Sequence, residues 1–418
     1  MASDRRRPER GSSRRESRPR AGACPSLTYE TLPWTARYEA YATTRSEQRK
    51  HQGPYQAAIP PKIRNANLEL PGEIAASVGD ASAELARFDE LMGGEIAQFS
   101  SMLLRTEAAA SSRIENLTAS ARAIAEAEIG SGHRKNAAEI VANTRTMVAA
   151  LDLAGNIRSE SVLAMHRALM SETDPLNAGR WRTEQVWIGG GNLGPHLALF
   201  VPPHHDRVAN AISDLMKFIE RDDLPVLAHA ALAHAQFETI HPFTDGNGRT
   251  GRALVHAMLR HGQLTRNVTI PVSAGLLSDT SAYFDALTAY RLGDPIPIVV
   301  QFANAAFRAV ANGRELVDEL RLLRQRWRQV VKARSDSAVW RLADLLLRRP
   351  AVNARVIAEE LSLDVGNVHR YVKPLLDARV LTQSLDVKRN QVWRAPDVLA
   401  ALDAFAARAG RRTRAPRS

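Results

Sequence analysis

The run from His241 to Arg252 reads His-Pro-Phe-Thr-Asp-Gly-Asn-Gly-Arg-Thr-Gly-Arg and joins a proton acceptor, a carboxylate, a glycine-rich turn and two guanidiniums. Histidine, with an ordinary pKa of roughly 6.5, suits removal of a proton from a hydroxyl near neutral pH. One carboxylate such as Asp245 is enough to hold Mg²⁺ when the phosphates of the substrate complete the coordination. The run therefore predicts a site for a nucleotide phosphate, with His241 as the base.

The glycines and arginines of the same run suit an anion. Gly246 and Gly248 lack a Cβ, so their backbone N–H groups can approach and surround phosphate oxygens. Arg249 opens an apolar helical stretch, which puts the turn at a helix N-terminus, where the helix dipole favours an anion. Arg252 lies one turn further on the same face and can form a forked contact with an outer phosphate. A turn that only caps a helix beside a buried histidine would need neither the carboxylate nor both arginines.

The run resembles the motif of the Fic family, His-Pro-Phe-x-Asp-Gly-Asn-Gly-Arg-x-x-Arg, at all nine specified positions. Fic enzymes transfer the AMP part of ATP to a Ser, Thr or Tyr hydroxyl of a target protein. The resemblance, which spans roughly residues 50–310, implies that His241 is the base and that Asp245 binds Mg²⁺. It implies that the residues holding ATP are Gly246, Asn247, Gly248, Arg249, Thr250, Gly251 and Arg252, with Arg252 at the γ-phosphate.

A second motif lies upstream, at Ser111-Ser-Arg-Ile-Glu-Asn116. It resembles the inhibitory motif of the Fic class with an N-terminal inhibitory helix, [Ser/Thr]-x-x-x-Glu-[Gly/Asn], and implies that Glu115 is the blocking residue. A carboxylate bonded to Arg252 would occupy the guanidinium that should hold the γ-phosphate. By itself the segment also fits a surface helix end with a Glu and an Asn cap.

A glycine-rich turn predicts a β-hairpin within residues 179–203. Apolar residues precede and follow Gly189–Asn192, a pattern typical of two strands joined by a tight turn. A lid that packs on the helices for stability alone is one interpretation. The resemblance favours a flap that clamps the target chain by strand addition, with Trp187, Ile188 and Gly189 nearest the acceptor hydroxyl.

Two aromatic residues, Tyr283 and Phe284, follow downstream. The resemblance places aromatic side chains of this segment against the adenine and ribose of ATP. Two aromatics in a helix core would have the same spacing, so both interpretations stay open.

Composition predicts a soluble, cytoplasmic chain with two or three domains, because 418 residues at 44% hydrophobic content can build real cores. No stretch reaches the ~18 apolar residues that a membrane helix needs, so we expect no membrane partner. The single cysteine, Cys24, excludes an internal disulfide and is expected to be incidental. The net charge of +11 is concentrated in two Arg-rich ends, residues 1–25 and 408–418, for which we expect disorder rather than a nucleic-acid-binding arm.

The elements between these ends are expected to be mainly helical. Apolar residues at three- and four-residue spacing predict helices over 81–105, 136–153, 160–170, 207–221 and 225–239, the first of them loosened at Gly93-Gly94. The Fic resemblance divides this part into an N-terminal region with the inhibitory helix, residues 50–135, and a catalytic core, residues 136–312.

The last third changes character after a charged linker helix at 313–334. Three apolar helices and a hairpin with the basic turn Lys388–Asn390 resemble a winged helix-turn-helix over residues 338–396. Its third helix would offer DNA four side chains: Asn367, His369, Arg370 and Lys373. Residues 354–395 carry only seven basic against five acidic side chains, so docking of a protein is an equal alternative.

Two functions from different classes follow. The first is a protein adenylyltransferase that uses ATP and Mg²⁺, restrains itself through Glu115 and modifies a target protein as well as itself. The second is a DNA-binding transcriptional regulator in which the Fic domain senses a nucleotide. Within the enzyme class, Gly248 favours AMP transfer, since the Doc-type kinases of the superfamily carry Lys there. Removal of AMP by the same site and assembly into a homodimer are both compatible with the resemblance.

Overall fold

The computed structural model describes residues 24–35, 44–93, 96–132, 134–383 and 391–411. The chain is mainly helical, as predicted, with two small antiparallel sheets. The helices of the first part are α1 (Arg45–Lys50), α2 (Gly72–Gly93), α3 (Ile96–Ile114), α4 (Ala121–Glu128), α5 (Lys135–Asp152), α6 (Ser159–Met170), α7 (His205–Ile219), α8 (Val226–Ile240), α9 (Asn247–His261), α10 (Val272–Leu277) and α11 (Thr280–Arg291). The remaining helices are α12 (Ile296–Val330), α13 (Ala338–Arg348), α14 (Ala354–Leu361), α15 (Val368–Asp377) and α16 (Pro396–Ala409). The strands are β1 (Thr28–Leu32), β2 (Tyr55–Ile59), β3 (Ala351–Asn353), β4 (Thr382–Gln383) and β5 (Val392–Arg394).

Helix α8 lies at the centre of the fold. All its residues from Leu227 to Ile240 are buried, as expected of a helix that is apolar on every side. Helices α7, α9 and α12 pack around it, and α9 carries the second half of the His241–Arg252 motif. The motif therefore rests on the most buried pair of helices.

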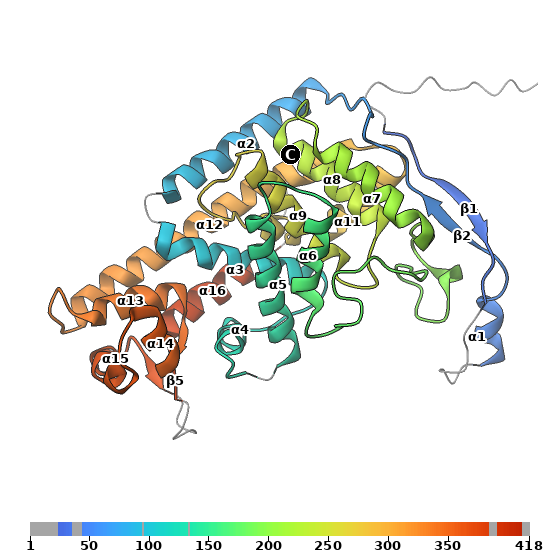
Figure 1. Cartoon of the computed structure of the whole chain (residues 1–418). Helices are drawn as coiled ribbons and strands as arrows, with labels where there is room; N and C mark the ends of the chain where they lie inside the picture. Colours follow the sequence, from blue (N-terminus) through green and yellow to red (C-terminus); the bar gives the residue numbers. More distant parts are fainter. Residues whose placement is uncertain (1–23, 36–43, 94–95, 133, 384–390, 412–418) are drawn as a thin grey trace, which may run out of the picture.

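The single helix predicted over 81–105 is wrong, because two helices, α2 and α3, occupy this stretch. Gly93 and Gly94 weaken helix formation between them. The buried Asp89 carboxylate also accepts hydrogen bonds from the backbone N–H groups of Asn267 and Val268 at 2.8–3.1 Å, which ties the end of α2 to another loop. The break separates α3 from α2 (Figure 1), and α3 ends at the motif Ser111–Asn116.

The N-terminal region begins earlier than expected. Cys24, placed by the sequence in a disordered end, is 3% exposed, and its burial raises the thiol pKa to about 11. Strand β1 follows it and pairs with β2 from Thr28↔Ile59 to Leu32↔Tyr55. Residues 1–23 of the predicted tail lie outside the described residues. Short strands of this kind depend on their tertiary partners, so local sequence gave no signal for them.

The predicted linker at 313–334 is the second half of α12, and the expected boundary after residue 312 falls inside that one helix. Buried side chains run along its length from Val299 to Trp327, because α2, α8, α11, α13 and α16 all pack against it. Figure 1 shows α12 running from the centre of the fold to the C-terminal helices. The C-terminal third is therefore joined to the rest by a packed helix.

The C-terminal third contains the three expected helices, α13 to α15, and a sheet of order β3-β5-β4. The expected hairpin is β4 and β5, paired at Thr382↔Arg394 and Gln383↔Trp393, while its turn Lys388–Asn390 lies outside the described residues. Helix α16 was not predicted, although Val398, Ala401 and Phe405 give it a buried stripe at helical spacing.

Helix α16 also takes in the start of the predicted basic end. The Arg408 guanidinium lies 2.9 Å from the Glu319 carboxylate of α12, so this arginine belongs to the packed fold, whereas residues 412–418 lie outside the described part of the chain. Among the described helices none is long and apolar enough to cross a membrane.

Candidate active site

A pocket of about 630 Å³ opens between the end of α3, the loop after α8, the start of α9 and helix α11. It brings together Glu115 and Arg252, which are 137 residues apart in the chain. The other sequence-selected residues that line it are Asn116, Trp187, Ile188, His241, Asp245, Gly246, Asn247, Gly248, Arg249, Tyr283 and Phe284. The two motifs therefore share one cavity.

The loop between α8 and α9 is fixed by its own residues. His241 ends α8 in the left-handed conformation, φ 50° and ψ 63°, and Gly246, at φ 75°, begins α9. The buried Asn247 side chain accepts a hydrogen bond from the Phe243 N–H and donates one to the Phe243 carbonyl, both at 2.9 Å. Asn247 was expected to bind the nucleotide, but its side chain stabilises the loop through these two hydrogen bonds.

The first turn of α9 lets a ligand or a carboxylate approach its backbone closely, because Gly248 has no side chain. A Cβ at Gly248 would overlap the Glu115 carboxylate, so this approach requires glycine. Thr250 and Gly251, expected to contact ATP, do not line the pocket. Thr250 is fully buried, and a Cβ at Gly251 would lie 2.9 Å from Phe237. Each helical residue turns about 100° from the last, which carries these two toward the packed side of α9.

The His241 ring is held neutral. Burial lowers its pKa to about 3, and the cationic Arg182 and Arg291 side chains add to the decrease. Its Nδ1 lies 3.8 Å from Glu238 Oε2 and has no hydrogen-bond partner among the described residues. The ring can therefore accept a proton from a group that enters the pocket.

A buried arginine that was not predicted from the sequence, Arg182, connects the loop between α8 and α9 with the segment 181–203. Arg182 is 4% exposed, and its guanidinium donates hydrogen bonds to the carbonyl oxygens of His241 and Glu184, both at 2.9 Å, and of Pro203. Burial lowers its pKa to about 10, so the side chain stays charged at neutral pH. No periodicity marks such a residue, because its partners are backbone atoms and two of them, at His241 and Pro203, belong to other segments of the chain.

His166 of α6 supports the loop from the opposite side. Its Nδ1 accepts a hydrogen bond from the Gly179 N–H at 3.0 Å, so Nε2 carries the proton and donates to the Asp245 carbonyl at 3.1 Å. The ring stacks on Phe243 with a centroid distance of 3.6 Å. Burial lowers the His166 pKa to about 4, which keeps this arrangement neutral. The sequence analysis missed His166, since an isolated histidine in a helix carries no motif.

Asp245 lies at the mouth of the pocket with its side chain 68% exposed. One carboxylate oxygen accepts a hydrogen bond from the Gly246 N–H at 2.6 Å, and the other lies 3.4 Å from the Arg249 guanidinium. Arg249 itself is buried between Asp245 and Glu139, whose carboxylate is 3.5 Å away. An exposed carboxylate beside a phosphate-sized space suits Mg²⁺, so Asp245 fits the expected metal ligand.

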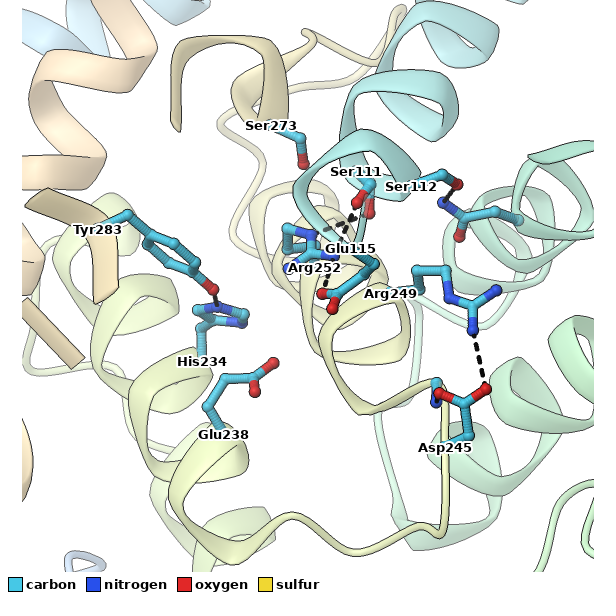
Figure 2. Close-up of polar contacts among 12 residues, drawn as sticks. Ser111, Ser112, Glu115, His234, Glu238, Asp245, Arg249, Arg252, Ser273 and Tyr283 are labelled. Atoms are coloured by element: carbon cyan, nitrogen blue, oxygen red, sulfur yellow. Dashed lines mark hydrogen bonds and ion pairs between the residues drawn. The ribbon is translucent and has the colours of Figure 1, made fainter. Parts of the chain in front are cut away.

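Arg252 is the most buried charge in the pocket, at 2% exposure, and three oxygens surround it. Its Nη2 donates to Glu115 Oε1 at 2.8 Å and to the Ser111 carbonyl at 2.9 Å, and its Nε donates to Ser111 Oγ at 2.9 Å. Figure 2 shows the Glu115 carboxylate pointing from the end of α3 toward Arg252. Glu115 remains 39% exposed, and Asn116 follows it with φ 61°. The structure thus places a carboxylate where an anionic ligand of Arg252 would lie.

Buried polar contacts hold α3 in place. The Glu107 carboxylate, with no exposed surface, accepts hydrogen bonds from the Ser273 N–H at 2.8 Å and from its hydroxyl, and lies 2.8 Å from His256 Nε2. Asn143 Nδ2 donates to Ser112 Oγ at 3.1 Å. These contacts bind α3 to α5, α9 and α10, so the position of Glu115 is set by the core.

The predicted hairpin at 179–203 is reduced to one antiparallel bridge, Ile188↔Phe200. The Ile188 N–H donates to the Phe200 carbonyl at 2.9 Å, but three successive left-handed glycines and a short 3-10 turn prevent a longer ladder. Trp187 and Ile188 line the pocket. Gly189 does not, because its backbone packs against Leu199.

The two aromatics of α11 lie differently. Tyr283 is 1% exposed, and its hydroxyl lies 2.7 Å from His234 Nε2 (Figure 2). Phe284 is 50% exposed. Both residues border the pocket. The Tyr283 ring is fixed by packing and by its hydrogen bond, whereas the Phe284 ring is exposed and can contact a ligand.

The four side chains predicted to face DNA are all on the surface of the C-terminal third. Asn367 precedes α15, and His369, Arg370 and Lys373 lie on it. His369 packs edge-on against Trp393 at 5.2 Å, and Lys373 lies 3.1 Å from the Asp377 carboxylate. On this exposed face, the charge of Lys373 is therefore already paired with a carboxylate of the same helix.

Comparison with known sequences and folds places this site in a family. Residues 156–259 match the Fic/DOC family, and residues 75–152 match the Fic/DOC family N-terminal region. The chain therefore contains a Fic domain, preceded by the N-terminal region of that family. The Fic domain thus contains α8, α9 and the His241–Arg252 loop, and the N-terminal region contains α3 with Glu115.

The chain is similar to proteins from two animals. It is 33% identical over 147 residues to "Protein adenylyltransferase fic-1" of Caenorhabditis elegans, a match that covers 34% of this chain and 26% of that protein. It is 29% identical over 155 residues to "Protein adenylyltransferase Fic" of Nematostella vectensis, covering 37% of this chain and 34% of that protein. The chain therefore spans about a quarter to a third of the length of these curated relatives.

One solved structure shares the fold over most of the chain. The crystal structure of a Fic family protein from Desulfovibrio desulfuricans G20 aligns with a TM-score of 0.50 and 19% identity. The alignment covers 81% of this chain and 98% of that one. At this identity the likeness establishes a shared fold alone.

Glu238 gives the Fic domain a pH-dependent stability. Burial raises the pKa of this carboxyl to about 7, and the nearby Glu115 carboxylate adds to the increase. Because the folded pKa exceeds the ordinary value of 4.5, the native state gains stability from the protonated form below pH 4.5 and loses it as the pH rises through 7. Glu238→Gln is therefore expected to raise the free energy of unfolding by about 3 kcal/mol at pH 8 and to have little effect at pH 4.5.

Urea unfolding of parent and variant at the two pH values measures this difference. Glu160→Gln, at the exposed start of α6, is the matched control and should change neither value. A stability difference that is the same at both pH values would show that the pKa of the Glu238 carboxyl is not raised in the folded protein.

Proposed function

We propose that this chain is a protein adenylyltransferase that transfers AMP from ATP to a Ser, Thr or Tyr hydroxyl of a target protein, and to itself. One observation carries the proposal: a partly buried, neutral His241 shares a pocket with the glycine turn of α9 and the buried Arg252. A base beside a site for phosphate oxygens is what transfer of a nucleotide to a hydroxyl requires. The names of the C. elegans and N. vectensis relatives agree with this activity.

In this reaction the hydroxyl oxygen of the target forms a bond to the α-phosphorus of ATP. The bond from that phosphorus to the oxygen that bridges to the β-phosphate breaks, and diphosphate leaves. His241 takes the proton of the hydroxyl. The low pKa of the His241 ring keeps it neutral and able to accept a proton, and the negative charge of the arriving triphosphate makes the proton transfer easier.

The phosphates are held by the first turn of α9 and by arginine. Backbone N–H groups at Gly246 and Gly248 meet the anion at the helix N-terminus, and Arg252 binds the γ-phosphate. Mg²⁺ held by Asp245 and the phosphates would neutralise negative charge on the departing diphosphate. Arg249, buried between two carboxylates, positions Asp245.

The same pocket restrains its own activity in this proposal. A carboxylate 2.8 Å from Arg252 competes directly with the γ-phosphate for one guanidinium. ATP then binds with its phosphates displaced from the line of attack. Glu115, with Ser111 and Asn116 at the end of α3, is the inhibitory element.

The segment around Trp187 and Ile188 is proposed to dock the target. Both residues line the pocket beside His241, and an extended chain could add to their exposed edge through backbone hydrogen bonds. Phe284, half exposed on the opposite side, is proposed to contact the adenine, with Tyr283 behind it.

Labelled ATP tests the reaction class. The parent and the Glu115→Gly variant are incubated with Mg²⁺, a lysate of the source cell and ATP labelled at either the α- or the γ-phosphorus. AMP transfer labels protein only from the α-position. Label from the γ-position alone would identify a kinase, and loss of α-label from protein labelled beforehand would favour removal of AMP.

DNA binding by the C-terminal third is a second candidate, favoured by the shared exposure of Asn367, His369, Arg370 and Lys373. If this face binds DNA, affinity is expected to fall steeply with salt, and Arg370→Ala with Lys373→Ala should reduce the salt slope by about one unit per lost phosphate contact. Lys217→Ala on α7, which removes one exposed positive charge outside the C-terminal third, is the control and should leave the slope unchanged. Gel-shift titrations at several salt concentrations measure the slopes, and an unchanged slope would assign this face to protein docking.

A further inference from the structure

A second cavity, of about 240 Å³, lies behind α3, on the side turned away from Arg252. Helix α3 contributes Arg105, Ala109 and Arg113 to its wall. Helices α4 and α16 close the other sides, with apolar side chains that include Ile124 and Phe405. The cavity therefore lies between α3 and the C-terminal helix α16, two helices that pack against each other (Figure 1).

The cavity walls are mainly apolar, and most of their charges are neutralised. Glu128 is paired with Arg105 at 2.5 Å. Asp403 accepts a hydrogen bond from the Ala121 N–H at the start of α4, at 2.9 Å, where the helix dipole favours an anion. The Glu128 charge is therefore balanced within the cavity wall, and the Asp403 carboxylate is exposed to solvent and oriented toward the start of α4.

Arg113 is the exception. It is partly buried, and its Nη1 donates to the Ala406 carbonyl at 2.7 Å, while no carboxylate of the described residues lies within ion-pair distance of it. The C-terminal end of α16 supplies roughly half a negative charge, which leaves about half of the guanidinium charge without compensation. An apolar space beside a partly buried cation is complementary to a ligand with an apolar body and one anionic end.

We propose that this cavity binds a small amphipathic carboxylate, with its hydrocarbon body between α3, α4 and α16 and its carboxylate on Arg113. An apolar cavity of about 150 Å³ is large enough for benzene, so 240 Å³ accommodates a ring with a short acid chain. A forked contact between the carboxylate and the guanidinium would fix the orientation. The site is separate from the ATP pocket, although Arg113 borders both.

Calorimetric titration of the full chain with three matched probes tests the proposal. The probes are 3-phenylpropionate, 3-phenylpropanol and 3-phenylpropylamine, which share the ring and chain and differ in the charge of the end group. The acid is expected to bind at least about tenfold more tightly than the alcohol, since a charge-assisted contact is worth that much. The amine should show no binding. The heat signal needs neither ATP nor AMP transfer, so failure of the proposed function leaves this test intact.

Variants of the cavity wall locate the site. Ala109→Leu fills the cavity and is expected to weaken binding of the acid at least tenfold. Arg113→Gln should abolish the preference for acid over alcohol, and Arg113→Lys should keep it. Ala76→Leu, at an exposed position of α2, is the control. Ala406→Leu fills the same space from α16 and replaces Ala109→Leu if that variant fails to fold.

Three results would overturn the proposal. The first is equal affinity of the acid and the alcohol for the parent. The second is absence of acid binding at millimolar probe. The third is acid binding that survives both cavity-filling variants, which would place the ligand elsewhere.

Discussion

Replacement of His241 by alanine is expected to lower AMP transfer by ~10²–10⁴-fold, the usual loss when a general base is removed. The ring makes no side-chain hydrogen bond through Nδ1 in the described structure, so its loss leaves no partner unsatisfied. Contacts to the phosphates come from the α9 backbone and Arg252, which the variant retains. ATP affinity should therefore change little while the rate of transfer collapses.

Labelling with α-labelled ATP measures the rate, and calorimetry measures ATP binding. His261→Ala, at the end of α9 and outside the pocket, is the matched control and should label targets at the parent's rate. His241→Asn guards against a folding artefact, because asparagine readily adopts the left-handed backbone conformation found at this position. Labelling by both His241 variants at the parent's rate would remove His241 from the mechanism.

Glu115→Gly is expected to raise AMP transfer, including self-modification, by roughly ten- to a hundredfold. Loss of one charge-assisted contact to Arg252 is worth ~1.5–3 kcal/mol, and the partial exposure of Glu115 puts the effect toward the lower end. Glu115 lies just beyond the last residue of α3, so glycine there interrupts no helix. The freed guanidinium becomes available to the γ-phosphate.

The double variant Glu115→Gly, Arg252→Ala should lose the gain, since the released group is then missing. Glu172→Gly, another exposed carboxylate just beyond a helix end, should leave labelling unchanged. Labelling rates at fixed ATP compare the four proteins. Labelling by Glu115→Gly at or below the parent's level would show that Ser111–Asn116 is only a helix end.

Sequence patterns sufficed for the parts of the site that are contiguous in the chain. The His241–Arg252 run could be interpreted residue by residue because α8 and α9 are adjacent and the loop between them is short. The helices over 136–153, 160–170, 207–221 and 225–239 were also predicted to within about two residues of α5, α6, α7 and α8, because each has a periodic apolar face.

The missed residues act across long distances in the chain. Arg182 and His166 bind backbone atoms of the catalytic loop, and only the folded chain brings these partners together. The placement of Asn247, Thr250 and Gly251 could not be predicted for a related reason: the motif specifies residue types but not which way each side chain turns on α9. Helix α16 is different, since its apolar stripe was visible and was overlooked beside the basic end.

The contact between Glu115 and Arg252 involves only the end of α3, and this determines how quickly activity can change with ATP. Glu107 and Asn143 hold α3 to the core as far as Ser112, so only the residues after it need to move for Arg252 to be released. A partly exposed side chain changes rotamer within nanoseconds, whereas displacement of a whole helix takes microseconds or longer. Because the Glu115 side chain re-equilibrates this fast, the protein does not stay in its earlier state after conditions change. We therefore expect the activity to change gradually and reversibly with the current ATP concentration, without hysteresis.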